Sequence, residues 1–260
     1  MAGRTLDELG LAEAPHDHPL SYPGAWPTES GLLHGDRMLP LERLVHEDRV
    51  PVLAVGSNAC PGQLRRKMDD FGIDSPIPMV RVRVTGIDVG VSAHVSRMGY
   101  VSASPVKSPH AVRELFLIWL DPRQLAVMDA SELNFWRARL PAPDVRIELP
   151  DGSTLPGAHA YVNWHGVLHD GAGMPRPHPG QHALLSELLM RSTPLRMLFG
   201  ETPEEFCARA RADAGLCDRG TRLFADQAWV TESGLEPYAH GRPPAPPGAG
   251  GSRRRPRPGV

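Results

Sequence analysis

The sequence predicts an α+β fold with a mixed sheet that is able to close into a barrel. Strand-like segments cluster between residues 50 and 164, and helical segments follow later in the chain. A helix follows the first strand directly, but the regular alternation of strands and helices of a doubly wound α/β protein is absent. At 260 residues, the chain is long enough for one sizeable domain with appendages.

In the first half of the body, patterns of apolar residues predict two helices and three strands. A short helix is expected over residues 39–46, and a helix from Pro61 to Gly72 places its proline in the first turn. The three strands are Val52–Val55, an alternating segment around Val80–Val84, and Arg113–Leu120.

In the second half, turn and capping signals mark the elements. Asp121-Pro122 opens a helix, and residues 145–164 predict a hairpin that turns at Asp151-Gly152. Two further helices are expected at 181–191 and 203–214, the second capped by Thr202. This gives a domain over 37–235, with a core at 50–165 and a helical addition at 180–215.

The two ends of the chain are predicted to lie outside that domain. Residues 1–36 are rich in turn formers and predict an irregular N-terminal extension. Residues 241–260, "GRPPAPPGAGGSRRRPRPGV", cannot fill a core and predict a disordered tail. The arginines of this tail fit a solubilising end better than a specific nucleic-acid site.

Charge and cysteine content limit the partners and the compartment. The formal net charge of −2 gives no global electrostatic reason to expect nucleic acid or an anionic membrane. No apolar run approaches the ~20 residues of a membrane span, and the N-terminus lacks the apolar core of a signal peptide. The three cysteines show no CxxC spacing, which is typical of reduced thiols. A cytoplasmic protein is expected, and the oligomeric state is left open.

The loop Gly56-Ser57-Asn58 is the first candidate site. It ends a buried strand and leads into a helix, so its backbone N–H groups and the helix dipole favour an anion. Gly56 allows a ligand to approach the backbone closely, and Ser57 and Asn58 add hydrogen-bonding side chains. An ordinary turn with a local side-chain bond is the alternative.

Glu132 is the second candidate. It sits among Leu133, Phe135 and Trp136, and an apolar setting lets a carboxylate take up a proton near neutral pH, as a general acid or base must. Alternatively, Glu132 faces solvent or pairs with Arg137 or Arg139.

The order and spacing of these segments resemble the γ-glutamylcyclotransferase-like superfamily. The chain carries "AVGSN" at 54–58, followed by Leu64, Arg65 and Arg66 in the next helix. It continues with "ELFLIWL" and "DPRQLAVMDASELNFWR", which place Asp129, Glu132 and Arg137 at the positions of the family's aspartate, catalytic glutamate and arginine. The hairpin "VRIELPDGSTLPGAHAYV" completes the pattern, so the resemblance spans about residues 50–165.

The resemblance implies a small mixed β-barrel flanked by helices, here with extra C-terminal helices. It also implies an acyltransferase- or lyase-type enzyme that cyclises a γ-glutamyl amine or peptide to 5-oxoproline and releases the amine. Glu132 would act as general acid/base, and Val55, Gly56, Ser57 and Asn58 would bind the substrate, without metal or cofactor. Val55 stands where the family has an aromatic residue and Leu133 where it has glycine, which leaves the released amine open.

Other functions compete with this interpretation. The same scaffold could be a catalytically silent domain that binds a small ligand or a protein. Acyl transfer through Cys60, near the helix start, is a weaker possibility. His165 and His169 are spaced as metal ligands, but they lie in a loop rich in glycine and proline, so no metal is expected. This loop is expected over the barrel mouth, with Asn163, Trp164 and His165 lining the pocket.

Overall fold

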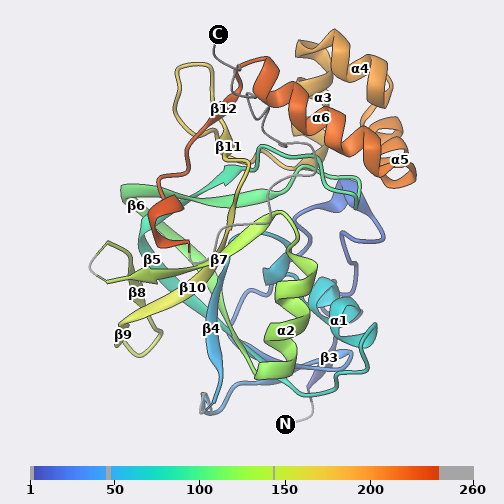
Figure 1. Cartoon of the computed structure of the whole chain (residues 1–260). Helices are drawn as coiled ribbons and strands as arrows, with labels where there is room; N and C mark the ends of the chain where they lie inside the picture. Colours follow the sequence, from blue (N-terminus) through green and yellow to red (C-terminus); the bar gives the residue numbers. More distant parts are fainter. Residues whose placement is uncertain (1–2, 45–47, 143, 240–260) are drawn as a thin grey trace, which may run out of the picture.

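The computed structural model describes residues 3–44, 48–142 and 144–239 (Figure 1). The strands of its large sheet are β1 (Arg4–Thr5), β2 (Gly31–His34), β3 (Arg37–Pro40), β4 (Val50–Ala54), β5 (Ile77–Val91), β6 (Ala103–Leu120), β7 (Phe135–Pro141), β8 (Arg146–Glu148), β9 (Thr154–Leu155) and β10 (Gly157–Asn163). A separate ladder joins β11 (Val167–Leu168) to β12 (Val230–Thr231). The α-helices of the described chain are α1 (Pro61–Asp69), α2 (Pro122–Ser131), α3 (Gln181–Arg191), α4 (Thr193–Phe199), α5 (Pro203–Ala212) and α6 (Ala214–Asp226). The predicted tail, 241–260, lies outside the described residues.

The large sheet is mixed. Its strand order is β1-β3-β2-β5-β6-β4-β10-β7, and β8 branches from β5 and carries β9. The ladder between β10 and β4 is parallel, whereas β4 and β6, β5 and β6, and β10 and β7 pair antiparallel. A mixed sheet with its late helices grouped at one end confirms the predicted α+β class.

The barrel is not seen: within the described chain the sheet stays open. One edge of β5 is divided, with Ile77–Met79 pairing with β2 and Arg83–Thr85 with β8. The outer edge of β7 meets Ala239 in an isolated bridge at Ala138. Because β8 is only three residues long and pairs with β9 on its other edge, no described ladder connects it to β7.

The open sheet still curls, because residues from distant strands share one buried face. Val84 and Leu117 of β5 and β6 belong to the same buried cluster as Leu140 and Val162 of β7 and β10. A register shift between Thr85 and Gly86 marks an irregularity in the long β5–β6 ladder. Bulges of this kind bend strands and increase their twist.

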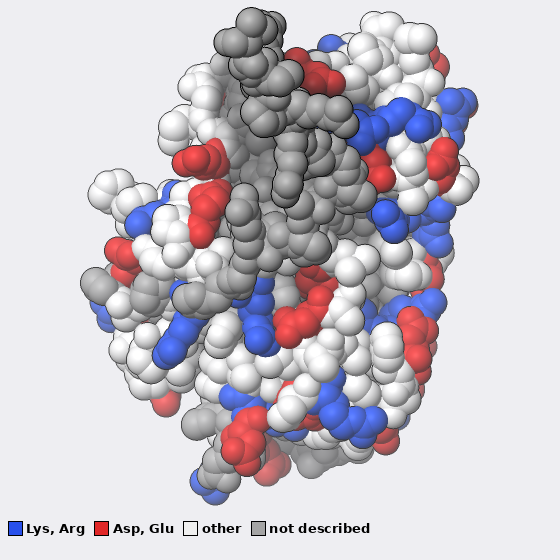
Figure 2. All heavy atoms as spheres, in the orientation of Figure 1, with Lys and Arg blue, Asp and Glu red and all other residues white. Residues whose placement is uncertain are grey.

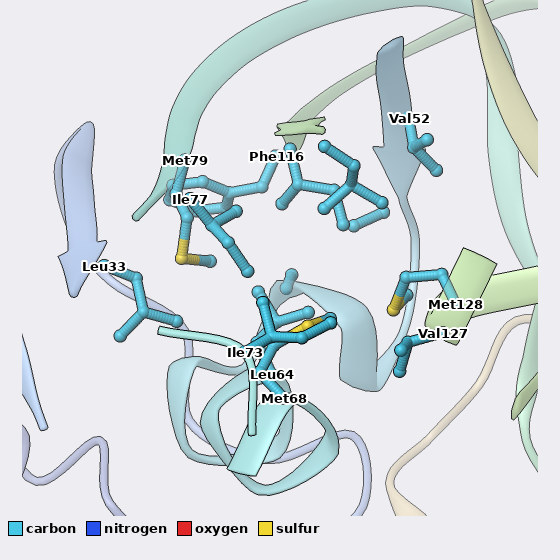
Figure 3. Packing of buried hydrophobic residues seen from close by; sticks show 14 of the residues in the cluster. Leu33, Val52, Leu64, Met68, Ile73, Ile77, Met79, Phe116, Val127 and Met128 are labelled. Carbon is cyan, nitrogen blue, oxygen red and sulfur yellow. The ribbon is translucent and has the colours of Figure 1, made fainter. Parts of the chain in front are cut away.

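The opposite face of the sheet packs against α1 and α2. Leu64 and Met68 of α1 face Ile77 and Met79 of β5 within a second buried cluster, which Met128 of α2 also joins (Figure 3). These positions on α1 are i and i+4, so they lie on one side of the helix. This packing brings the start of α1 and the end of α2 next to the end of β4, where Asn58 contacts Glu132.

The N-terminal segment is less irregular than predicted. It supplies β1 and β2 to the sheet, and β2 pairs with both β3 and β5. The helix predicted over 39–46 is wrong in its described part, because Arg37–Pro40 is strand β3; residues 45–47 lie outside the description. Pairing with β2 decides the conformation here, and a four-residue apolar pattern does not reveal that pairing. The domain boundaries themselves stay a prediction.

Capping signals located several helices well. Asp121 forms a full capping box with Gln124 on α2, and Thr202 caps α5, as predicted. The helix predicted over 203–214 ends two residues earlier, at Ala212, because Asp213 caps a further helix, α6. Helices α3 to α6 form their own buried cluster beyond the far ends of β5 and β6 (Figure 1).

The predicted hairpin forms with a different return strand. β8 pairs with β9 around the turn at Asp151-Gly152, whereas β10 leaves the hairpin to pair with β7 and β4.

Acidic and basic side chains are interspersed over the face shown in Figure 2. None of the helices in the described chain has both the length and the apolar character needed to cross a membrane.

Candidate functional site

The Gly-Ser-Asn loop lies at the carboxyl end of β4, in the interior of the sheet between β6 and β10. Ser57–Ala59 form one 3-10 turn before α1 starts at Pro61. The N–H groups of Ala59 and Cys60 bond back to the carbonyls of Gly56 and Ser57, at 2.9 and 3.0 Å. Across the described residues, no backbone carbonyl takes the N–H of Gly56 or Asn58, so these donors remain for a ligand.

Tyr22 and Tyr100 pack against this loop. The Tyr22 hydroxyl accepts a hydrogen bond from the Ala103 N–H at 2.8 Å, and the two rings lie 4.5 Å apart. A Cβ atom at Gly56 would collide with the Tyr22 hydroxyl, so this position needs glycine for space rather than for an unusual φ. Burial raises the pKa of both tyrosines, which keeps them neutral.

Glu132 caps the C-terminus of α2 and points to the loop. Its Oε1 accepts hydrogen bonds from Asn58 Nδ2 at 3.1 Å and from Lys67 Nζ at 2.9 Å, and Lys67 Nζ also donates to Asn58 Oδ1 at 3.0 Å. The three side chains therefore form a closed triangle. Because the Lys67 and Glu132 side chains are only 14% and 15% exposed, this ion pair is well shielded from solvent.

The alternative partners predicted for Glu132 are engaged elsewhere or on another face. Arg137 Nη1 lies 3.1 Å from the Asp129 carboxylate, which also accepts a hydrogen bond from the Tyr161 hydroxyl at 2.8 Å. Arg139 is exposed on β7. Glu132 thus sits in a polar triangle and not in the purely apolar setting expected from its neighbours in sequence.

One cavity of about 1210 Å³ is lined by all the residues predicted for catalysis and substrate binding. Val55, Gly56, Ser57, Asn58 and Glu132 all line it. Of the residues expected from the histidine-rich loop, Trp164 and His165 line it too, while Asn163 lies buried behind them.

Sequence reasoning missed three parts of this cavity. Lys67 sits one turn after Gln63 on α1, and both line the cavity, as their i, i+4 spacing allows. Tyr22 comes from the N-terminal segment, and no local signal connects it to the loop. Helix α6, which was not predicted, supplies a wall that includes Asp218 and Arg222; its N-cap residue, Asp213, is the signal that could have located it.

Comparison with known proteins adds little to this geometry. No protein-family model matches the chain, and no curated protein matches it. Among solved structures, one described as "Gamma-glutamyl cyclotransferase" matches with a TM-score of 0.34 and 10% identity, covering 71% of this chain and 89% of that chain. Values this low establish neither family nor activity.

Cys60 is a structural residue here. It is fully buried, its Sγ donates to the Glu13 carbonyl at 3.3 Å, and burial raises the pKa of its thiol. A buried, protonated thiol is a poor nucleophile, so the geometry does not support acyl transfer through Cys60.

The histidines of the 165–182 region do not gather. His169 bonds to the Ala228 carbonyl at 2.7 Å, and His178 lies 3.2 Å from the Val101 carbonyl. Over the described part of the chain, no three His, Cys, Asp or Glu side chains group as a metal site would require.

Proposed function

We propose that this protein cyclises γ-glutamyl amines or peptides to 5-oxoproline, with Glu132 as general acid/base. One observation carries the proposal: the Glu132 carboxylate lies within 3.1 Å of the Asn58 side chain, in the same cavity as the free N–H groups of Gly56 and Asn58. A proton-transfer group therefore faces anion-binding donors across a space that a substrate can enter.

The chemistry needs only these groups. Glu132 takes a proton from the substrate's α-ammonium, and the freed amine attacks the γ-carbonyl carbon of the same molecule. A C–N bond forms, and the loop N–H groups stabilise the oxyanion of the tetrahedral intermediate. The bond to the departing amine then breaks as Glu132 returns the proton to its nitrogen. Glu132 next takes the second proton from the ring nitrogen, which leaves the neutral lactam, and passes it to the released amine, which departs as an ammonium; no water is consumed.

Positioning supplies much of the rate in such a reaction. Ring closure is intramolecular, and good orientation of reacting groups contributes up to about 7–11 kcal/mol. The Val55–Asn58 loop would hold the substrate folded, with its anionic group on the loop amides. Lys67 would hold the Glu132 carboxylate pointed at the loop, through its 2.9 Å contact.

A release assay for 5-oxoproline tests the proposal. The panel contains γ-glutamyl amines, γ-glutamyl dipeptides and glutathione, each with wild-type protein, Glu132→Gln and Glu204→Gln. Glu204 lies on α5 and is exposed, so Glu204→Gln is a matched control. We expect release by the wild type and the control, and a loss of about 10²–10⁴-fold in Glu132→Gln. Equal activity of Glu132→Gln, or no release from any compound, contradicts the proposal.

A catalytically silent ligand-binding domain is the second candidate. One observation favours it: the Lys67 ammonium and the Asn58 side chain both donate to Glu132 Oε1, so this oxygen already accepts two hydrogen bonds. A carboxylate held in this way can also serve as a fixed charge that orients a ligand. Binding of γ-glutamyl compounds by calorimetry, without 5-oxoproline release, would support this function instead.

A further inference from the structure

The cavity is larger than a γ-glutamyl group requires. At about 1210 Å³, it exceeds the range of about 300–1,000 Å³ in which proteins bury drug-sized ligands. The Asn58–Lys67–Glu132 triangle occupies one part of its wall. The rest of the cavity is therefore available to the group attached to the γ-glutamyl nitrogen.

A continuous chain of aromatic rings also lines the cavity, and it starts at Phe135, whose N–H donates to the Glu132 carbonyl at 2.9 Å. Phe135 meets His94 edge-on at 5.5 Å between ring centroids, and His94 stacks on His165 at 5.9 Å. His165 contacts Trp164 at 5.8 Å, and Trp164 contacts Trp136 at 6.4 Å. All five rings line the cavity, and all but His94 are only partly buried.

Partial burial separates these rings from the ordinary core. Trp119, by comparison, is 4% exposed and packs within the cluster formed by β5, β6, β7 and β10. Trp136 and Trp164 keep ring surface toward the cavity instead. Apolar surface left facing a cavity is available to a ligand that excludes water from it.

Hydrogen bonds behind the rings fix their orientation. The Asn163 side chain, only 1% exposed, lies 2.8 Å from His94 Nδ1 through its Nδ2 and accepts the His165 N–H at 2.9 Å through its Oδ1. Trp164 Nε1 donates to His165 Nε2 at 2.6 Å. A wall held by buried partners before the ligand arrives is preorganised for binding.

The histidines of this wall are uncharged near neutral pH. Burial lowers the pKa of His94 to about 3, and the neighbouring His165 acts in the same direction. Burial also lowers the pKa of His165, against the opposing effect of Asp218 on α6. The rings therefore offer flat, neutral surface, which suits another ring better than a small charged group.

We propose that the Phe135–His165–Trp164 wall binds an aromatic ring on the amine that is released, so that the substrates are γ-glutamyl amides of aromatic amines. This inference rests on the proposed cyclisation at Glu132. The γ-glutamyl group would lie at the Gly56–Asn58 loop, and the aromatic ring would stack on Trp164, which lines the same cavity.

A matched pair of substrates tests the ring directly. γ-Glutamyl-2-phenylethylamide and γ-glutamyl-ethylamide differ only in the phenyl group. In the wild type we expect kcat/KM to be about 10–100-fold higher for the phenylethylamide, the effect of burying one aromatic side chain. In Trp164→Ala the ratio should fall toward one, and in Trp164→Phe most of it should return. Trp229→Ala, a tryptophan stacked on Phe224 away from the cavity, should keep the wild-type ratio.

Calorimetry on the same two compounds separates this inference from the proposed function. If both release 5-oxoproline at equal kcat/KM and bind equally, the aromatic wall is overturned while the cyclisation stands. If neither releases 5-oxoproline but the phenylethylamide binds at least tenfold tighter to wild type and not to Trp164→Ala, the wall stands while the cyclisation fails. A ring preference that Trp164→Ala leaves intact overturns the assignment to this wall.

Discussion

The two ends of the cavity differ in how they are built. At the charged end, Asn58, Lys67 and Glu132 satisfy one another within two short segments that follow β4 and α2. At the aromatic end, Trp164 and His94 come from separate strand connections, and α6 supplies a further part of the wall. The charged end brings together two short segments, whereas the aromatic end draws on several distant parts of the chain.

This difference separates chemistry from specificity. The groups proposed to move protons lie at strand and helix ends, where backbone geometry fixes them directly. The groups proposed to choose the amine are held through Asn163 and through pairing of β7 with β10. A change of substrate could therefore arise at the aromatic end without disturbing the triangle.

The largest effect on stability is expected at the charged end. Lys67→Met leaves the Glu132 carboxylate without its cation in a shielded position. Removing one partner of a fully buried pair costs about 3–5 kcal/mol, so for this slightly exposed pair we expect a loss of about 2–4 kcal/mol in the free energy of unfolding. Urea denaturation measures it, and adding Glu132→Gln should recover most of the loss.

An exposed ion pair provides the control for Lys67. Arg146 and Glu148 lie 3.3 Å apart with side chains 64% and 38% exposed. Arg146→Met should change the free energy of unfolding by less than about 1 kcal/mol. If both lysine and arginine variants lose the same small amount, the triangle is no more than a surface contact.

The contrast between the two ends also explains what the sequence could predict. Capping at Asp121 and Thr202 and the loop after β4 are local signals, so α2, α5 and the predicted site residues could be located. Lys67 was missed, although its i, i+4 spacing from Gln63 would have placed it on the same side of α1. The role of Tyr22 could not be predicted, because it depends on contacts 81 residues away along the chain, at Ala103.

The barrel was a wrong expectation for a related reason. Alternating residues predict strands, but they do not predict which edges meet. Here β2 takes part of the β5 edge, and Ala239 meets β7. Both contacts come from segments expected to lie outside the core, so the local pattern held no information about closure.

The next expected effect is at Gly56, which lines the cavity against Tyr22. Gly56→Ala would drive a methyl group into the Tyr22 hydroxyl. Overpacking of this kind costs about 1–3 kcal/mol and should displace the loop that holds the substrate. We expect lower thermal stability together with a raised KM for γ-glutamyl substrates. Gly72→Ala is the control. A Cβ atom at Gly72 would meet open space, but the φ of +61° there favours glycine, so this variant should leave KM unchanged.

Acid sensitivity is expected to arise at the aromatic end. In the unfolded chain, His94 takes up a proton as the pH falls below its ordinary pKa of 6.5. In the folded protein, it takes up a proton only near its lowered pKa of about 3. Stability due to this residue is therefore lost as the pH falls from 6.5 toward 3. Between pH 7 and pH 5, wild type should lose about 2 kcal/mol more than His94→Gln, since each pH unit below 6.5 contributes about 1.4 kcal/mol.

Urea midpoints at both pH values measure this loss, and an exposed histidine gives the control. His182 is 66% exposed on α3, so His182→Gln should lose stability with pH just as the wild type does. Parallel losses in wild type and His94→Gln would mean that His94 takes up its proton in the folded protein. The neutral aromatic wall would then lose one of its supports.

The smallest expected effect comes from removing the Tyr22 hydroxyl. Tyr22→Phe removes the acceptor of the Ala103 N–H but keeps the ring that packs on Tyr100, so a buried donor loses its partner. This should lower the free energy of unfolding by about 1–2 kcal/mol, while Tyr238→Phe, at a partly exposed hydroxyl, should change it less. The methyl group of Gly56→Ala would collide with this same Tyr22 hydroxyl. Tyr22→Phe should therefore reduce the loss of stability that Gly56→Ala causes. A double-mutant cycle with no coupling between the two changes would show that the loop shifts away from Tyr22, and the glycine would then be needed for the ligand alone.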